Sequence, residues 1–187
     1  MARVPYLARE DASPETTALW DRLESERKVP TAHIFQALAH APDLLDAFLS
    51  YANAMRDRSR LSPKLRELAI LSVGHAVGSE YEIAHHHSHG LKAGLTEAQV
   101  AAVADFEGSA EFDDLELAVL RLARESSLSV DVAEQTWKAA AAHLDDQQMV
   151  ELTLNIAWYN SGVRVMGLLG IELEDSYSSP RTHADLS

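Results

Sequence analysis

The sequence predicts an all-α fold. Apolar residues recur at three- and four-residue spacing over about 41–57, 113–127, 131–143 and 146–169, which is the period of one helix face. Alternating β-branched runs, which are typical of strands, are absent from the sequence. Residues that cap helices stand where several of these elements would begin.

The earliest predicted helix begins at a Ser-Pro pair at 13–14 and places Leu19, Trp20 and Leu23 on one face. The same pair recurs at 62–63 and begins another helix with an apolar face. Proline fits the first turn of a helix because the N–H that it lacks would have no partner there. Both pairs therefore predict sharp helix starts.

Two helices are predicted to meet close to Gly94. This glycine is a typical stop for the helix over 79–93, and Thr96 with Gln99 has the spacing of a capping box that begins the next helix. A helical hairpin is therefore expected. The periodic runs after it complete the predicted bundle.

The chain is interpreted as a single domain over 1–187, with its core at about 41–173. Its length fits one ordinary domain, and no internal repeat or low-complexity boundary divides it. About the first thirty residues and the polar tail at 176–183 are interpreted as arms, which pack on a neighbouring subunit or stay mobile.

Composition limits the classes of function. Sixteen Lys and Arg against 29 Asp and Glu give a net charge of −13, which repels phosphate backbones and excludes nucleic acid as an expected partner. No run approaches the roughly 18 apolar residues of a membrane span, and the first residues lack a secretion signal. We therefore expect a cytoplasmic protein that does not bind membranes. The absence of cysteine excludes disulfides, thiolate clusters and thiol nucleophiles.

Carboxylates and imidazoles gather on the helix predicted over 79–93. Glu82, His86 and His89 follow one another at four- and three-residue spacing, so they share one helix face. Ser79 and His85 lie on the margins of that face. The sequence therefore places a candidate site here.

Residues 61–103 resemble the carboxymuconolactone decarboxylase superfamily, which includes the alkylhydroperoxidase D-like (AhpD-like) proteins. The segments that carry the resemblance are 61–68, 78–82, His86 and 94–96, together with 157–160 and 166–173, which are similar to the closing helix of the family. The resemblance implies an AhpD-like helical bundle. It also implies an obligate or near-obligate homo-oligomer, either a trimer or a hexamer.

The peroxidase branch of this family uses a glutamate and a histidine to activate a Cys-x-x-Cys pair. Glu67 and His86 match the two relay residues, but Ser79 and Glu82 stand at the cysteine positions. Neither side chain can supply a thiolate of low pKa. Thiol peroxidase chemistry is therefore excluded, and a peroxiredoxin label drawn from family membership alone would be chemically unsupported.

Glu67, Glu82 and His86 are the candidate catalytic residues. Glu67 lies mid-helix near the apolar side, where its partner is either purely structural or part of a site. If Glu67 contacts His86, the carboxylate orients the imidazole and raises its basicity, which makes His86 the general base. Glu82 then donates or accepts a second proton. By its resemblance to the decarboxylase branch of the family, the chain is expected to be a cofactor-independent lyase, decarboxylase or isomerase. Its expected substrate is a small carboxylic acid or lactone.

Four residues are candidates for binding the substrate: Ser79, His85, Tyr159 and Arg164. Arg164 lies on the last apolar helix and is expected to meet either a substrate carboxylate or Glu151. The sequence assigns no role to four further histidines: His33, His40, His87 and, apart from the metal hypothesis, His89.

Two alternatives stay open. Glu82, His86 and His89, with Glu67 as a fourth group, offer oxygen and nitrogen ligands for Zn²⁺, Fe²⁺ or Mn²⁺. Their spacing is not the His-Glu-x-x-His motif, so no cofactor is favoured and a divalent metal remains an alternative. In the other alternative the chain is a non-catalytic binding protein that has kept the fold.

Overall fold

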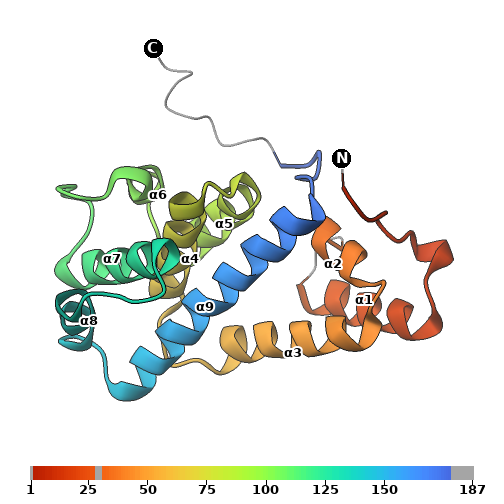
Figure 1. Cartoon of the computed structure of the whole chain (residues 1–187), viewed down its shortest axis with the longest axis horizontal. Coiled ribbons are helices and arrows are strands. Elements are labelled where there is room, and N and C mark those ends of the chain that lie inside the picture. The colour runs from red at the N-terminus through yellow and green to blue at the C-terminus, as the bar shows by residue number, and fades with distance from the viewer. Residues whose placement is uncertain (1, 28–30, 178–187) are drawn as a thin grey trace, which may run out of the picture.

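The computed structural model describes residues 2–27 and 31–177, and the regular structure in these residues is entirely helical (Figure 1). The α-helices are α1 (Pro14–Arg27), α2 (His33–Leu38), α3 (Pro42–Arg58), α4 (Pro63–Val77), α5 (Glu80–Lys92), α6 (Glu97–Ala102), α7 (Asp114–Leu128), α8 (Glu134–Ala141) and α9 (Asp146–Leu169). Two 3₁₀ turns, η1 (Arg9–Asp11) and η2 (Val103–Asp105), complete them. The all-α prediction is confirmed.

The helix starts predicted from capping residues are also confirmed. Helix α1 begins at Pro14 and α4 at Pro63, where the hydroxyl of Ser62 accepts the backbone N–H of Leu65. Thr96 and Gln99 form both hydrogen bonds of the predicted capping box at the start of α6. Local cap chemistry therefore fixes where these helices begin.

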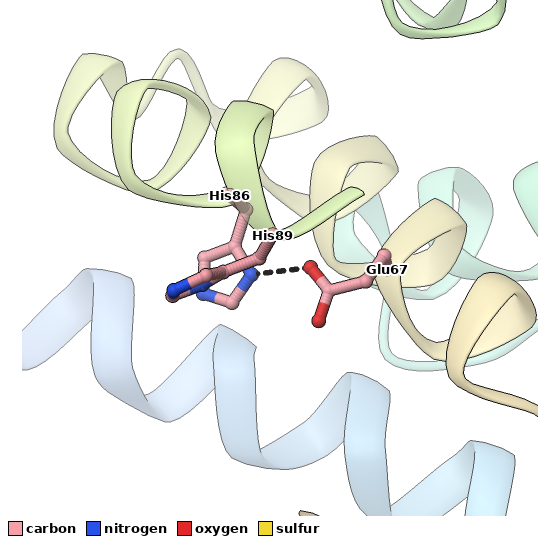
Figure 2. Close-up of side chains that lie close together, drawn as sticks. All are labelled: Glu67, His86 and His89. Carbon is pink, nitrogen blue, oxygen red and sulfur yellow. Dashed lines mark hydrogen bonds and ion pairs between the residues drawn. The ribbon is translucent and has the colours of Figure 1, made fainter. Parts of the chain in front are cut away.

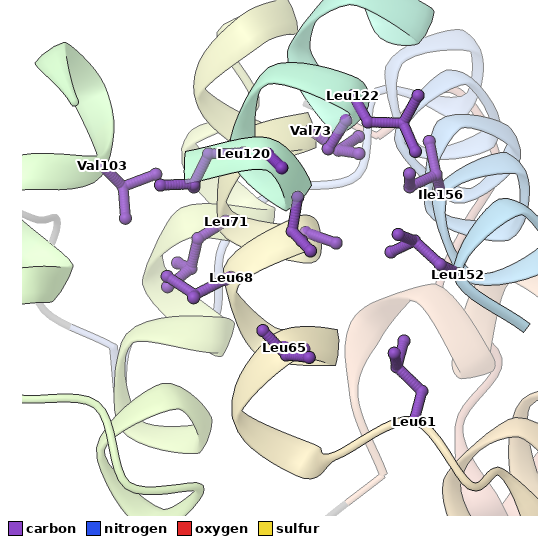
Figure 3. Close-up of a cluster of buried hydrophobic side chains, with 14 of the residues drawn as sticks. Leu61, Leu65, Leu68, Leu71, Val73, Val103, Leu120, Leu122, Leu152 and Ile156 are labelled. Atoms are coloured by element: carbon purple, nitrogen blue, oxygen red, sulfur yellow. The ribbon is translucent and has the colours of Figure 1, made fainter. Parts of the chain in front are cut away.

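Helix α4 lies at the centre of the molecule, between α5, α7 and α9. Every residue from position 68 to 74 is buried, so this helix is covered on all sides. Leu68, Leu71 and Val73 pack with Leu120 of α7 and Leu152 of α9 in the main core (Figure 3). Because a tightly packed central helix cannot shift, the side chains that it carries are held in fixed positions.

The N-terminal residues form part of the packed structure, which differs from their interpretation as an arm. Trp20 and Leu23 of α1 are buried with Leu45 and Leu49 of α3 in a second cluster. The apolar face of α1 thus finds its partner within the same chain. Of the predicted C-terminal arm, residues 176–177 lie against α5, and the rest lies outside the described residues.

Within residues 2–27 and 31–177, none of the helices combines the length and the apolar character that crossing a membrane requires. The predicted trimer or hexamer stays a prediction.

Candidate functional site

A cavity of about 980 Å³ lies between the main core and the second cluster. Helices α4, α5 and α9 line one part of it, α2 and α3 another, and residues 174–177 close it near α5. Much of the lining is aromatic or aliphatic, and Trp158 packs on Phe48 with ring centroids 4.1 Å apart. Polar side chains converge on this apolar space from α4 and α5, as is typical of small-molecule sites.

Close packing of α4 and α5 brings the polar groups together. Gly74 of α4 lies where an added Cβ would be 3.1 Å from the Ile83 side chain of α5, so the missing side chain permits the approach. Glu67, two helical turns before Gly74, then reaches His86 on α5. Hydrogen bonding across the helix pair therefore depends on this small residue.

Both ring nitrogens of His86 are paired with carboxylates. Nδ1 lies 2.7 Å from Oε2 of Glu67, and Nε2 lies 3.1 Å from Oε1 of Glu82, one turn earlier on the same helix. The three side chains are between 8% and 15% exposed. An imidazole donates at both nitrogens only when it is protonated, so this geometry indicates an imidazolium between two carboxylates.

The pKa values agree with this arrangement. Burial lowers the pKa of His86, but the charges and hydrogen bonds of Glu67 and Glu82 more than offset it and raise the pKa to about 10. Burial raises the pKa of Glu67, but the charge and hydrogen bond of His86 leave it below its ordinary value. His86 is therefore charged at neutral pH. This geometry favours a proton donor over the general base expected from the sequence, because an imidazolium has no free lone pair.

His89 lies one turn after His86, with its ring beside that imidazole (Figure 2). Burial of the ring, followed by the charge of His86, lowers the pKa of His89 to about 4, although the residue as a whole is exposed. Tyr159 of α9 meets His86 edge-on, with ring centroids 5.0 Å apart. A neutral imidazole and an aromatic ring thus flank the charged one.

Among the described residues, Glu67, His86 and His89 form a group whose ligand atoms lie within 4.8 Å of one another. The predicted metal set was Glu82, His86 and His89, with Glu67 as a fourth group. The structure brings three of these four residues together and leaves out Glu82, which faces the other ring nitrogen of His86.

The predicted substrate-binding residues divide into two pairs. His85 and Tyr159 line the cavity, whereas Ser79 and Arg164 do not. Ser79 is the N-cap of α5 and accepts the backbone N–H of Glu82. Arg164 is exposed and donates to two oxygens of Asn160, one turn earlier on α9.

Glu151, the alternative partner expected for Arg164, binds elsewhere. Its carboxylate accepts the hydroxyl of Ser59 and the backbone N–H groups of Arg60 and Leu61. It therefore fixes the turn before α4. Three of the unassigned histidines also contact their own chain: His33 bonds to the Glu172 carbonyl, His40 to the Pro5 carbonyl, and His87 pairs with Glu97.

Sequence reasoning missed Glu174, which lines the cavity from the segment after α9. Its carboxylate accepts the backbone N–H of His33 at 2.7 Å, the hydroxyl of Tyr81 at 2.7 Å and Nε2 of His85 at 2.6 Å. Desolvation raises the pKa of Glu174, but these hydrogen bonds, led by that of His85, bring it down to about 2.

His85 is also held between two aromatic rings. Tyr81 stacks on it at 4.3 Å between ring centroids and Tyr177 at 3.9 Å. Burial, followed by the bond to Glu174, raises the pKa of Tyr81. No local pattern predicts this cluster, because its members come together only in the tertiary structure.

The model of the carboxymuconolactone decarboxylase family matches residues 42–125, which include α4 and α5. No curated protein matches the chain.

Several solved structures share the fold. One is the alkylhydroperoxidase AhpD core of an uncharacterized peroxidase-related protein from Ralstonia eutropha JMP134, with a TM-score of 0.81, 18% identity, and coverage of 94% of this chain and 93% of that one. Another is the debrominase Bmp8, in a variant with a cysteine replaced by alanine and in complex with 2,3,4-tribromopyrrole, with a TM-score of 0.81, 18% identity and 92% of each chain covered.

A third is a peroxidase-related protein from Silicibacter sp. TM1040, with a TM-score of 0.80, 15% identity, and coverage of 94% of this chain and 93% of that one. At these identities the likeness shows the AhpD-like fold and not a shared activity.

Proposed function

We propose that this chain is a cofactor-independent lyase, decarboxylase or isomerase that works by proton transfer, because residues 42–125 match the carboxymuconolactone decarboxylase family and the chain has no cysteine. The observation that carries the proposal is the buried His86 held between Glu67 and Glu82 at the wall of the cavity. Perturbed ionisable groups in a cavity are typical of acid–base sites.

The two carboxylates are expected to have different roles. Glu67 comes from α4, bonds to Nδ1 and keeps the imidazolium oriented and charged. Glu82 bonds to Nε2 and also lines the cavity. Displacement of this weaker contact by a substrate would free the Glu82 carboxylate as a base and expose the Nε2–H as an acid. The pair then divides base and acid work between two neighbouring groups.

This pair suits substrates that react through an enolate. In an isomerisation of an unsaturated carbonyl compound, Glu82 removes a proton from the carbon between the carbonyl and the double bond, and His86 returns one to the far carbon of the conjugated enolate. The proton on Glu82 then passes back to His86. In a decarboxylation, the C–C bond to the carboxylate breaks, carbon dioxide leaves, and the electron pair stays on the substrate until His86 protonates it. A proton from solvent then restores the charge of His86, so each reaction balances without a cofactor.

The cavity also supports a substrate with an apolar ring or chain. Phe35, Phe48 and Trp158 give it an aromatic wall, and Ile70 and Met166 add aliphatic surface. The structure of Bmp8 with 2,3,4-tribromopyrrole shows that a protein of this fold binds a small planar heterocycle. We therefore propose small lactones and keto acids with a compact apolar body as the substrate class.

Proton exchange in D₂O tests the proposal, with loss of substrate C–H signals followed by NMR over a panel of lactones and keto acids. We expect exchange or turnover with the wild-type protein and a rate lower by about two decades or more in Glu82→Gln and His86→Gln. His87→Gln, on the same helix but outside the cavity, is the matched control. A ligand that binds without exchange, and binds equally well to Glu82→Gln, would instead identify a non-catalytic binding protein.

A further inference from the structure

We infer that Glu67, His86 and His89 form a binding site for a divalent transition-metal ion, with Glu82 as the carboxylate that orients the ligating His86. The inference goes beyond the proposed proton transfer, because it concerns what these atoms bind and not which reaction they catalyse. Ligand atoms of the three side chains lie within 4.8 Å of one another.

The ligand types fit this class of metal. Two imidazoles and one carboxylate form the set that binds zinc in several catalytic sites and non-haem iron in others. Hard ions such as Mg²⁺ and Ca²⁺ prefer oxygen, so a set with two nitrogens selects against them. Three protein ligands also leave at least one position of the ion open, and all three residues line the cavity.

The distances need a small adjustment. Ligand atoms arranged tetrahedrally at about 2.1 Å from a zinc ion lie about 3.4 Å apart. Nδ1 of His86 and Oε2 of Glu67 are closer than this at 2.7 Å, because a shared proton now joins them. His89 has to approach, and it is free to do so because it is the exposed member of the group.

Glu82 supplies the second requirement of such a site. A histidine that ligates a metal through one nitrogen usually donates its other N–H to a carboxylate, which fixes the ring and raises its basicity. With Nδ1 of His86 facing Glu67, the other nitrogen, Nε2, already lies 3.1 Å from Oε1 of Glu82. The outer partner is therefore in place before any metal binds.

The charges around the site are compatible with binding of a divalent metal ion. A metal at Nδ1 replaces the proton that joins His86 to Glu67, so the site gains one positive charge next to two carboxylates. Among cationic side chains, Arg66 acts on Glu67 and Lys92 acts on His89. Lys92 is exposed, so solvent screens its repulsion. The metal and the relay proton compete for one nitrogen, so a loaded site has no Glu67–His86 relay.

Calorimetric titration of the untagged protein with Zn²⁺ tests the inference directly. We expect about one ion per chain for the wild type, binding at least tenfold weaker in His89→Ala, and binding tenfold to a hundredfold weaker in Glu82→Gln. His87→Ala serves as the matched control and should bind like the wild type. Circular dichroism of each variant confirms that the helices remain folded.

Two results would overturn the inference: no stoichiometric binding by the wild type, or equal affinity in His89→Ala and the wild type. Cobalt(II) gives an independent readout, because the visible spectrum of the loaded protein reports histidine ligation and should change in His89→Ala but not in His87→Ala. None of these measurements uses turnover, so failure of the metal site and failure of the proposed enzyme activity are distinguishable.

Discussion

At the scale of single residues, His86 is the group whose surroundings determine its chemistry. Burial alone would lower the pKa of His86 and leave the ring neutral. The two carboxylates reverse that effect because each accepts one of its N–H groups. A buried ion pair of this kind is not by itself a gain in stability, but removing one partner leaves a buried charge and is costly. The site therefore makes stability depend on pH.

The sign follows from the two pKa directions. The pKa of His86 is raised from 6.5 to about 10, so its contribution to stability is complete below pH 6.5 and is lost as the pH rises toward 10. The pKa of Glu67 is lowered from 4.5, so its contribution is complete above pH 4.5 and is lost as the pH falls below that value. The pair is therefore most stabilising between about pH 4.5 and 6.5.

We expect His86→Gln to lower the free energy of unfolding by about 3 kcal/mol in that window, because two buried carboxylates lose their cation. The difference from the wild type should shrink between pH 7 and pH 10. Urea unfolding over a series of pH values measures it, with His87→Gln as the matched variant. A difference that stays constant from pH 6 to pH 10 would contradict the assigned protonation of His86.

At the scale of elements, the sequence predicted helices best where a short-range signal exists. Ser62 with Pro63, and Thr96 with Gln99, marked the starts of α4 and α6 because a cap depends on a few neighbouring residues. The packing partner of α1 could not be predicted in the same way. Its apolar face was visible, but whether α3 or another subunit covers it depends on the tertiary fold.

The same limit explains the outcome for the site. Helical spacing placed Glu82 and His86 together, and the family resemblance added Glu67 from another helix. Arg164 does not line the cavity. Because α9 carries apolar residues on several faces, periodicity could not show which side of the helix meets the cavity. Glu174 had no signal, because three donors reach it from α2 and α5.

The turn between α4 and α5 gives a test at this scale. Gly78 ends α4 in the left-handed region at φ 68°, and an added Cβ there would meet no other atom. Gly78→Ala should therefore lower the free energy of unfolding by about 1 kcal/mol through backbone strain alone. Gly167→Ala is the control, since Gly167 is helical and also has open space, and it should raise that free energy by about 0.5–1 kcal/mol. Two shifts of the same sign in urea unfolding would contradict this account.

At the scale of the whole molecule, the cavity exists because separate parts of the chain enclose it. The main core supplies Glu67 and His86, the second cluster lies on the other side, and the segment after α9 closes the gap. The N-terminal residues contact the end of α9 near that segment, where the backbone N–H of Arg3 donates to the carbonyl of Leu169. Residues 174–177 are therefore a structural wall of the site.

Glu174 connects this wall to the rest of the molecule, so its replacement tests the closure. Glu174→Gln keeps the size of the side chain but turns one acceptor into an amide donor, which faces the donors of His33, Tyr81 and His85. We expect a loss of about 1–3 kcal/mol in the free energy of unfolding, because partly buried donors lose a charged acceptor.

Faster hydrogen exchange confined to residues 171–177 and the start of α2 should accompany this loss. Mass spectrometry of peptides from these segments measures the exchange, and α8 gives an internal reference. Glu134→Gln is the matched control, because its exposed pair with Lys138 on α8 should contribute less than about 0.5 kcal/mol. Unchanged exchange at 171–177 in Glu174→Gln would mean that stacking of Tyr177 on His85 holds the wall without the carboxylate.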